Sequence, residues 1–112
     1  DDAFFKWVVD IGLTGPDQGK GGKYLFIHKD YDGEIPAGYF VAKTPTFRNI
    51  LFFRAFVVNG DLAATAAAVK SGFHSYLLAE SSNPSAQVFK NLSGVQFNTV
   101  HANNYRFFEE LN

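Results

Sequence analysis

Residues 7–24, WVVDIGLTGPDQGKGGKY, form a glycine-rich connection between two apolar segments. Five glycines and Pro16 fall within residues 12–22, between WVVDI and KYLFI. Because glycine reaches positive φ at little cost and proline fixes its own φ, this composition favours a long, shaped turn. The stretch therefore predicts strands over residues 4–9 and 24–28, joined by a glycine loop.

Four more apolar segments are typical of strands. They cover residues 39–43, 48–58, 73–78 and 87–92. The segment at 48–58 is nearly continuous in apolar and aromatic residues, which predicts a central core strand covered on both faces. The chain is therefore expected to be mainly β, and α+β in detail.

Two short helices complete the predicted elements. Residues 62–71 are rich in alanine, Asp61 is a favourable N-cap, and Gly72 stands where a left-handed C′ residue ends many helices. The last residues, NNYRFFEELN, predict an amphipathic helix that is capped by Asn103 or Asn104. Both ends of the chain fall inside predicted elements. We therefore expect residues 1–112 to be a single segment, the C-terminal part of a larger β-rich domain.

The charge composition argues against several classes of partner. Ten basic and eleven acidic side chains give a net charge of −1, with no run of like charge, so no nucleic acid is expected. The absence of cysteine excludes a disulfide framework and a cysteine-ligated metal. The apolar stretches are far shorter than the ~20 residues of a transmembrane helix, so no membrane span is expected.

The aromatic content is high, with 13 Phe, five Tyr and one Trp. A fully buried large side chain supplies roughly 2–3 kcal/mol, whereas ordering the chain costs about 1.5 kcal/mol per residue. A segment that leaves half of these rings exposed would not fold alone. We therefore expect the rings to be covered by the remainder of the chain, a companion domain or a homo-oligomeric partner.

The glycine loop has a second interpretation, as an anion site. Backbone N–H groups in glycine-rich turns bind anions, and Lys20 and Lys23 are suited to pair with them. A P-loop needs four residues between its first glycine and the Gly-Lys pair, whereas Gly15 and Gly19 enclose three. The segment KYLFI, which follows, is typical of a strand and not of a helix. A structural turn is therefore favoured.

Four residues are candidates for a catalytic or ligand-binding site: Arg54, His101, Asp10 and Asp17. A carboxylate pair beside the glycine loop suits acid/base chemistry, although turn hydrogen bonds explain both aspartates more simply. Arg54 interrupts the predicted core strand, which favours a structural ion pair with Asp10 or contact with an anionic ligand. His101 is a candidate general base, but no Gly-x-Ser-x-Gly nucleophile motif accompanies it.

No cofactor and no metal site is expected. His28, His74 and His101 are 46 and 27 residues apart, and this spacing does not match a helical zinc site. Convergence of the three side chains in space is the alternative.

Three sequence blocks occur in order: GPD-x-G-x-GGKY, PxGY and N-T-x-x-x-N-x-x-x-FFExLN. With these blocks the chain resembles the later part of the domain of unknown function 1254, over essentially all 112 positions. The resemblance implies a bacterial, commonly exported protein, a jelly-roll-like β-sandwich with short helices, and a following domain of unknown function 1214. It implies no reaction. The family varies where this chain has FHSYLLAE, so no role is carried over to His74 or Glu80.

Two functional hypotheses follow. The first is a noncatalytic β-sandwich module, periplasmic or extracellular, that assembles or binds through aromatic surface. The second is a hydrolase-like enzyme or small-molecule binder whose pocket is shared with a companion domain. A concave pocket that gathers at least two of the four candidate side chains favours the second, and a flat apolar face favours the first. The sequence leaves open whether the protein is an enzyme.

Overall fold

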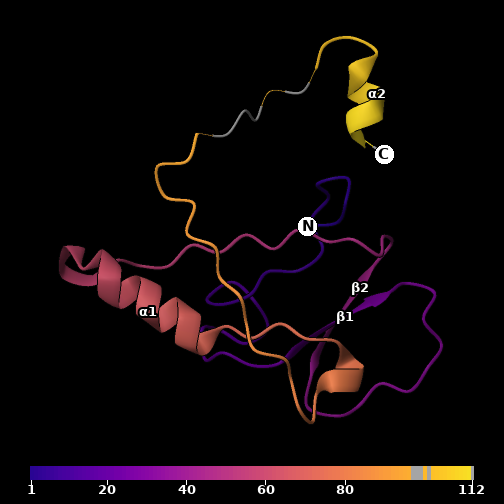
Figure 1. Ribbon diagram of the computed structural model, residues 1–112. Coiled ribbons are helices and arrows are strands. Elements are labelled where there is room, and N and C mark those ends of the chain that lie inside the picture. Colours follow the sequence, from indigo (N-terminus) through magenta and orange to yellow (C-terminus); the bar gives the residue numbers. More distant parts are fainter. Residues whose placement is uncertain (97–99, 101, 112) are drawn as a thin grey trace.

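The computed structural model describes residues 1–96, 100 and 102–111. In chain order the elements are the strands β1 (Tyr24–His28) and β2 (Phe40–Thr44), the 3₁₀ turn η1 (Val58–Gly60), the helix α1 (Leu62–Gly72), the 3₁₀ turn η2 (Leu78–Glu80) and the helix α2 (Arg106–Leu111). Long irregular segments connect them, and α1 and α2 lie away from the sheet (Figure 1).

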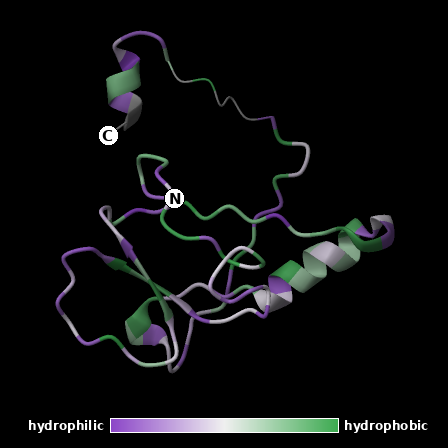
Figure 2. Cartoon of the chain, turned by 180° about the vertical axis from the view of Figure 1, so that it is seen from behind, coloured by the Kyte–Doolittle hydropathy of each residue, from purple (hydrophilic) through white to green (hydrophobic). Residues whose placement is uncertain are grey.

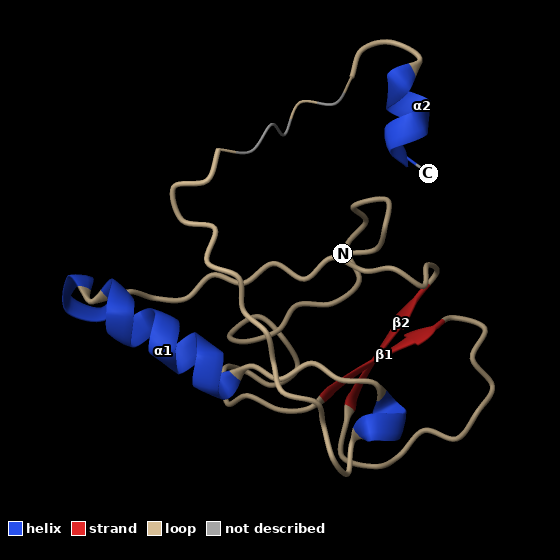
Figure 3. Ribbon diagram, in the orientation of Figure 1, coloured by secondary structure: helices blue, strands red, loops and turns tan. Residues whose placement is uncertain are grey.

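The two strands form one parallel, two-stranded sheet (Figure 3). Tyr24 lies opposite Phe40, and the register continues to the pair His28 and Thr44. The connection over residues 29–39 carries the chain back to the start of the sheet without a helix. Parallel strands usually need a longer crossover with a helix, which packs on the sheet. Here no such layer covers the two strands.

The core of the described chain is small. Only Leu25, Ile27 and Ala42 are buried hydrophobic residues among the described positions. Leu25 and Ile27 alternate with half-buried neighbours along β1, as expected for a strand with one covered face. Figure 2 shows the remaining hydrophobic residues spread along the irregular chain.

The prediction of a mainly β, jelly-roll-like β-sandwich is wrong for the described residues. They contain two strands in one sheet, whereas a sandwich requires two packed sheets. The segments at residues 4–9, 73–78 and 87–92 form no strand. A strand is stable only when its backbone N–H and C=O groups pair with a neighbour, and these segments have no such partner strand.

The predicted core strand at residues 48–58 is also wrong. Apart from an isolated antiparallel bridge between Asp2 and Asn49, this segment pairs with no strand, and residues 51–60 are all exposed. Phe56, for example, is 83% exposed. The apolar pattern correctly marks residues that favour burial, but the surface that would bury them is not supplied by the described residues.

The helix at residues 62–72 confirms its prediction, including the cap. The side chain of Asp61 accepts a hydrogen bond from the backbone N–H of Ala64, which is the expected N-cap contact. The predicted end is different. Gly72 is the last helical residue, and Phe73, with φ −100° and ψ 124°, leads the chain away in an extended conformation. No left-handed glycine is needed, because the Phe73 N–H bonds the Val69 carbonyl directly.

The final helix is confirmed over Arg106–Leu111. Of the two predicted caps, Asn104 makes the contact, since its Oδ1 accepts a hydrogen bond from the Arg106 backbone N–H at 3.0 Å. Asn103 is exposed.

Candidate functional site: an aromatic groove along the first strand

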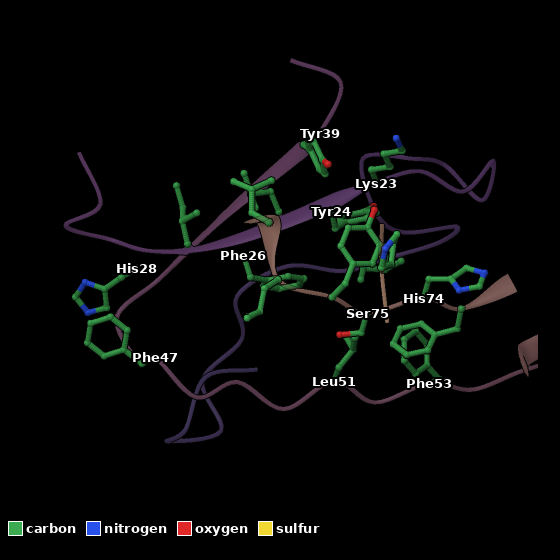
Figure 4. Close-up of a pocket in the computed structure, with 18 of the residues that line it drawn as sticks. Lys23, Tyr24, Phe26, His28, Tyr39, Phe47, Leu51, Phe53, His74 and Ser75 are labelled. Carbon is green, nitrogen blue, oxygen red and sulfur yellow. The ribbon is translucent and has the colours of Figure 1, made fainter. Parts of the chain in front are cut away.

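A groove of about 1000 Å³ lies beside β1, and we refer to it as the aromatic groove (Figure 4). Its lining comes from β1, from residues 72–78 and from isolated positions in the loops. Eight rings of Phe and Tyr contribute to it: Tyr24, Phe26, Tyr31, Tyr39, Phe47, Phe53, Phe73 and Tyr76. This volume is at the upper end of the range for small-molecule sites, which is roughly 300–1000 Å³.

The wall opposite β1 is held by a side chain. Gln87 accepts a hydrogen bond from the Ser75 backbone N–H at 2.9 Å and donates one to the Ser75 carbonyl at 2.8 Å. This pair of bonds imitates the contact that a neighbouring strand would make. Phe73 and Phe53 also pack edge to face, with ring centroids 4.7 Å apart. The segment from Phe73 is thereby fixed near the groove without forming a strand.

The polar groups of the groove are basic or neutral. Lys23, His28 and His74 line it, together with Ser75 and the tyrosine hydroxyls, and the lining contains no carboxylate. The Lys23 ammonium lies 5.9 Å from the centroid of the Tyr39 ring, a distance typical of a cation–π contact. Charge within the groove therefore favours an anionic group on any ligand.

His28 is held in place by the backbone and by a ring. Its imidazole stacks on Phe47 at 4.4 Å with an interplanar angle of 11°, and its Nε2 lies 3.0 Å from the Pro45 carbonyl. The backbone N–H of Asp30 reaches Nδ1 at 3.3 Å, so the two ring nitrogens are both engaged. The Asp30 carboxylate is bound by Lys29 at 2.7 Å, and this hydrogen bond lowers the pKa of Asp30 below its ordinary value.

The groove offers binding contacts, and no carboxylate lies in its lining to orient a base. The Nε2 of His74 is directed to the Ser71 carbonyl at 3.2 Å. General-base catalysis needs a base within reach of the proton that it removes and usually a second group that orients the base. The lining brings together aromatic rings, hydroxyl groups, two imidazoles and the Lys23 ammonium, without a carboxylate.

Of the predicted site residues that the structure describes, Arg54, Asp10 and Asp17, none lines this groove. Arg54 is exposed, does not line the groove and forms no ion pair within the described part of the chain. The predicted pairing with Asp10 is therefore wrong, since the Asp10 carboxylate accepts from Trp7 Nε1 at 3.2 Å. His101 lies outside the described residues.

Asp17 is the organising residue of the glycine loop. Its carboxylate accepts hydrogen bonds from the backbone N–H of Gly12 at 2.7 Å, the N–H of Gly21 at 3.1 Å and the Tyr24 hydroxyl. Its exposed fraction is 4%. The hydrogen bond from Tyr24 is the largest cause that lowers the pKa of Asp17, followed by the bond from Gly12. Burial and the same hydrogen bond raise the pKa of Tyr24.

This geometry supports the structural interpretation of the glycine loop. Two backbone N–H groups that an external anion would need are taken by the loop's own carboxylate. Gly12, Gly19 and Gly21 adopt positive φ, which is the conformation that their abundance predicts. The loop is thus a closed turn around Asp17, and the chain continues from its last residues directly into β1.

The sequence predicts little of the groove. Lys23 is predicted only as a cation beside an anion-binding loop, and the sequence gives His74 no role. A signal was available in the aromatic residues of segments 24–28 and 73–78, both of which have strand-like patterns. It did not show that the two segments would lie on opposite sides of a groove, because that depends on how residues 29–72 are arranged.

The described residues offer neither a metal-binding cluster nor a membrane-spanning helix. No group of three or more His, Asp or Glu side chains there lies close enough to hold a metal ion. None of the helices found there has the length and apolar character to cross a membrane.

The model of a family described as protein of unknown function (DUF1254) matches residues 1–77. The glycine loop, the sheet, α1 and most of the groove lie within the matched range, whereas the third sequence block, at residues 98–112, lies beyond it. No curated protein and no solved structure gives a significant match.

Proposed function

This chain belongs to the DUF1254 family of proteins of unknown function, and we propose that it is a noncatalytic binding and assembly module. Its aromatic surface packs against further polypeptide, in the remainder of its own protein or in a companion domain. The observation that carries this proposal is the amount of surface that the chain leaves exposed.

The exposed surface is much larger than that of a finished domain. The chain exposes 9783 Å², whereas a folded monomer of 12.4 kDa exposes about 6100 Å². The Cα radius of gyration is 16.9 Å, against about 13 Å for a compact domain of this length. The excess area exceeds the roughly 800 Å² that each partner contributes to a standard protein interface. Much of the chain's surface is therefore available to other polypeptide.

The exposed surface is apolar in character. Among the described residues 25 large hydrophobic side chains are exposed, whereas only two, Leu25 and Ile27, are buried. Phe47 is 88% exposed, Phe56 83% and Tyr105 78%. Monomeric proteins rarely expose large contiguous apolar patches, and such patches mark sites of interaction. Coverage of these rings by polypeptide would recover roughly 25 cal/mol for each Å² removed from water.

The behaviour of the isolated chain tests this proposal. We expect the β1–β2 sheet of the purified 112-residue chain to be formed, but the chain to melt without one transition common to all of its residues. We also expect it to bind a dye that reports exposed apolar surface and to self-associate as its concentration rises. Calorimetry, dye fluorescence and analytical ultracentrifugation measure these three properties. A compact monomer that melts cooperatively in dilute buffer would overturn the proposal, because it would show that the rings need no partner.

A second candidate function is small-molecule binding, including a hydrolase-like activity in a pocket shared with a companion domain. The concave groove favours it over a flat surface, and its basic lining suits an apolar carboxylate. The proposal of catalysis is weaker, because the groove gathers none of Arg54, Asp10 and Asp17. Saturable binding of 2-naphthoate that is lost in Lys23→Gln would support this candidate. Equal binding by the two proteins would reject it.

We also propose that the protein is exported to the periplasm or the cell exterior and acts as a homo-oligomer. The family resemblance supports export, and the exposed aromatic surface supports association. Fractionation of cells that express the full-length gene, followed by size measurement of the native protein, tests both parts. A cytoplasmic monomer would contradict them.

A further inference from the structure

The aromatic groove follows the free edge of β1. The sheet has two strands, so each strand has one edge without a strand partner. The Phe40 N–H bonds the Lys23 carbonyl at one end of the sheet, and the Lys29 N–H bonds the Thr44 carbonyl at the other. With the parallel register, this pattern directs the backbone groups of Leu25 and Ile27 toward β2. Those of Tyr24, Phe26 and His28 point outward.

All five residues of β1 line the groove, whereas none of β2 does. Successive side chains of a strand point to opposite faces of a sheet. A cavity on one face would therefore contact every second residue of β1. Contact with both faces places the groove around the outer edge itself, where the Phe26 N–H has no partner among the described residues.

The opposite wall leaves this edge open. Residues 73–78 contribute six consecutive lining residues, and the chain is extended at both Phe73 and Leu77. Their contact with β1 is not a ladder, because β1 is paired only with β2 among the described residues. The Ser75 N–H and carbonyl are both bonded to the Gln87 side chain. Two extended segments thus flank a groove with an unpaired strand edge on one side (Figure 4).

We propose that the aromatic groove receives an extended polypeptide strand, which adds to the outer edge of β1. The inserted strand carries apolar side chains that contact the rings and a carboxylate beside Lys23. Unpaired backbone groups give such strand addition its affinity, and the pockets for alternate side chains give it specificity. The absence of acidic residues from the groove lining supplies the charge complementarity.

This inference rests on the proposed assembly function and names the way in which the partner is held. It also accounts for the small sheet. Two strands alone are marginally stable in water, and a third strand would extend the hydrogen-bonded ladder over Tyr24, Phe26 and His28. The partner is therefore expected to stabilise the sheet as well as cover the rings.

Three synthetic peptides test the mode of binding to the 112-residue chain. The parent is a capped hexapeptide of alternating valine and threonine that ends in glutamate. The other two have the same side chains, but the amides of every second residue are N-methylated, in one frame or in the other. A strand pairs with its neighbour through the amides of alternate residues. We therefore expect the parent peptide to bind and the peptide methylated at the pairing amides to lose about tenfold or more in affinity. The peptide methylated at the other amides should bind like the parent.

Variants of the chain provide the matching test. Phe26→Pro removes an outward N–H and spares the ladder to β2, as proline at an edge position does. Phe26→Ala removes the ring and keeps the N–H. We expect Phe26→Pro to lose peptide binding, and Phe26→Ala to retain the discrimination between the two methylated frames. Lys23→Gln should reduce affinity for the glutamate peptide several-fold and leave a glutamine-ended peptide unaffected.

Hydrogen exchange locates the bound strand. Addition of the parent peptide should protect the amides of Phe26 and His28, while those of Leu25 and Ile27 are protected before it is added. Equal binding of all three peptides, or no saturable binding of the parent, would overturn strand addition. Protection of these amides at high chain concentration without peptide would overturn it in favour of a second copy as the occupant.

The two proposals fail in different ways. If the chain self-associates through its rings but does not discriminate between the methylated frames, strand addition is rejected and assembly is retained. If the isolated chain is a compact, cooperative monomer, the assembly function is rejected whatever the peptides do.

Discussion

Residues 1–50 and the described residues of 51–111 have similar apolar patterns but differ in burial. All of the described buried residues lie between Asp2 and Thr44, and both strands belong to this first region. The second region contains α1 and α2, and none of its described side chains is buried. The abundance of hydrophobic residues therefore does not explain which part of the chain is buried.

The first region is ordered by satisfied polar groups. The Asp2 carboxylate, 1% exposed, accepts from the N–H groups of Phe4 and Lys6. The Thr44 hydroxyl donates to the Asn49 side chain at 2.7 Å. Asp2 and Asp17 hold turns that precede β1 in the chain, and Thr44 holds the turn that follows β2. The second region has the exposed N-cap of α1 and the Gln87 contact, but no comparable buried polar network in its described residues.

The comparison teaches that hydrogen bonds within turns can hold a small sheet, while a longer apolar segment of the same chain remains exposed. Buried polar groups are costly unless they are bonded, so the geometry of each bonded turn is specific. Apolar side chains have no such directionality and require an opposing surface. The following experiments test whether this difference is the cause of the contrast.

The largest effect is expected for Gly15→Ala in the first region. An added Cβ would collide with the Asp10 carbonyl and lie 2.9 Å from the Asp17 Oδ1, so the turn around Asp17 must open. We expect a loss of about 1–3 kcal/mol in the local opening free energy of β1, as for other overpacked sites. Hydrogen exchange measures it. If exchange in residues 24–28 is unchanged, the glycine loop does not hold the sheet.

Changes of pH should act on the first region selectively. The pKa of Asp17 is lowered in the folded chain, so its contribution to stability is present above 3.8, its ordinary value, and is lost as the pH falls through the folded pKa. The pKa of Tyr24 is raised, so its contribution is present below 10.0 and is lost as the pH rises through the folded pKa.

We therefore expect the protection factors of the amides in residues 12–28, which correct exchange for its intrinsic dependence on pH, to fall at both extremes of pH and to be largest between these two values. In the variant Tyr24→Phe the alkaline loss should vanish, while the N–H groups of Gly12 and Gly21 preserve part of the acid loss. An identical alkaline profile in this variant would show that another group titrates.

A smaller effect is expected for Thr44→Val. The substitution preserves the shape of a side chain that is 2% exposed and removes the hydroxyl that bonds Asn49. We expect a loss of about 1 kcal/mol in the opening free energy of β2. Thr14→Val, at an exposed threonine, is the matched control and should have little effect. Equal effects at the two sites would mean that the buried hydroxyl contributes nothing specific.

The smallest effect is expected in the second region, at α1. Asp61→Ala removes the N-cap acceptor of Ala64 and should destabilise the helix by about 0.5–1 kcal/mol, as measured by exchange in residues 62–72. Gly72→Ala is its counterpart, because an added Cβ there meets no neighbouring atom and should stabilise the helix by about 0.5–1 kcal/mol. Neither change should alter exchange in β1. If either does, the two regions are coupled.

Local patterns predicted the parts of the fold that depend on neighbouring residues. The strand at Tyr24–His28, the strand ending near Thr44, the capped α1 and the Asn104 cap of α2 could all be read from the sequence. The four further strands could not be predicted reliably, since an apolar run shows a preference for burial without naming the partner. Among the site residues, Asp17 was recognised as a turn former, whereas the convergence of Lys23 and His74 was not.

The sequence by itself determined the chemistry of the turns, because glycine dihedrals and short-range hydrogen bonds of Asp17 and Asp61 act within a few residues. It also determined that many rings would need cover. Only the tertiary structure decided that β1 and β2 are parallel, that residues 73–78 face β1 across a groove and that residues 48–58 stay exposed. These features depend on contacts between residues that are distant in the sequence. Such contacts must offset the entropy lost when long loops are closed, and no local pattern specifies which surfaces make them.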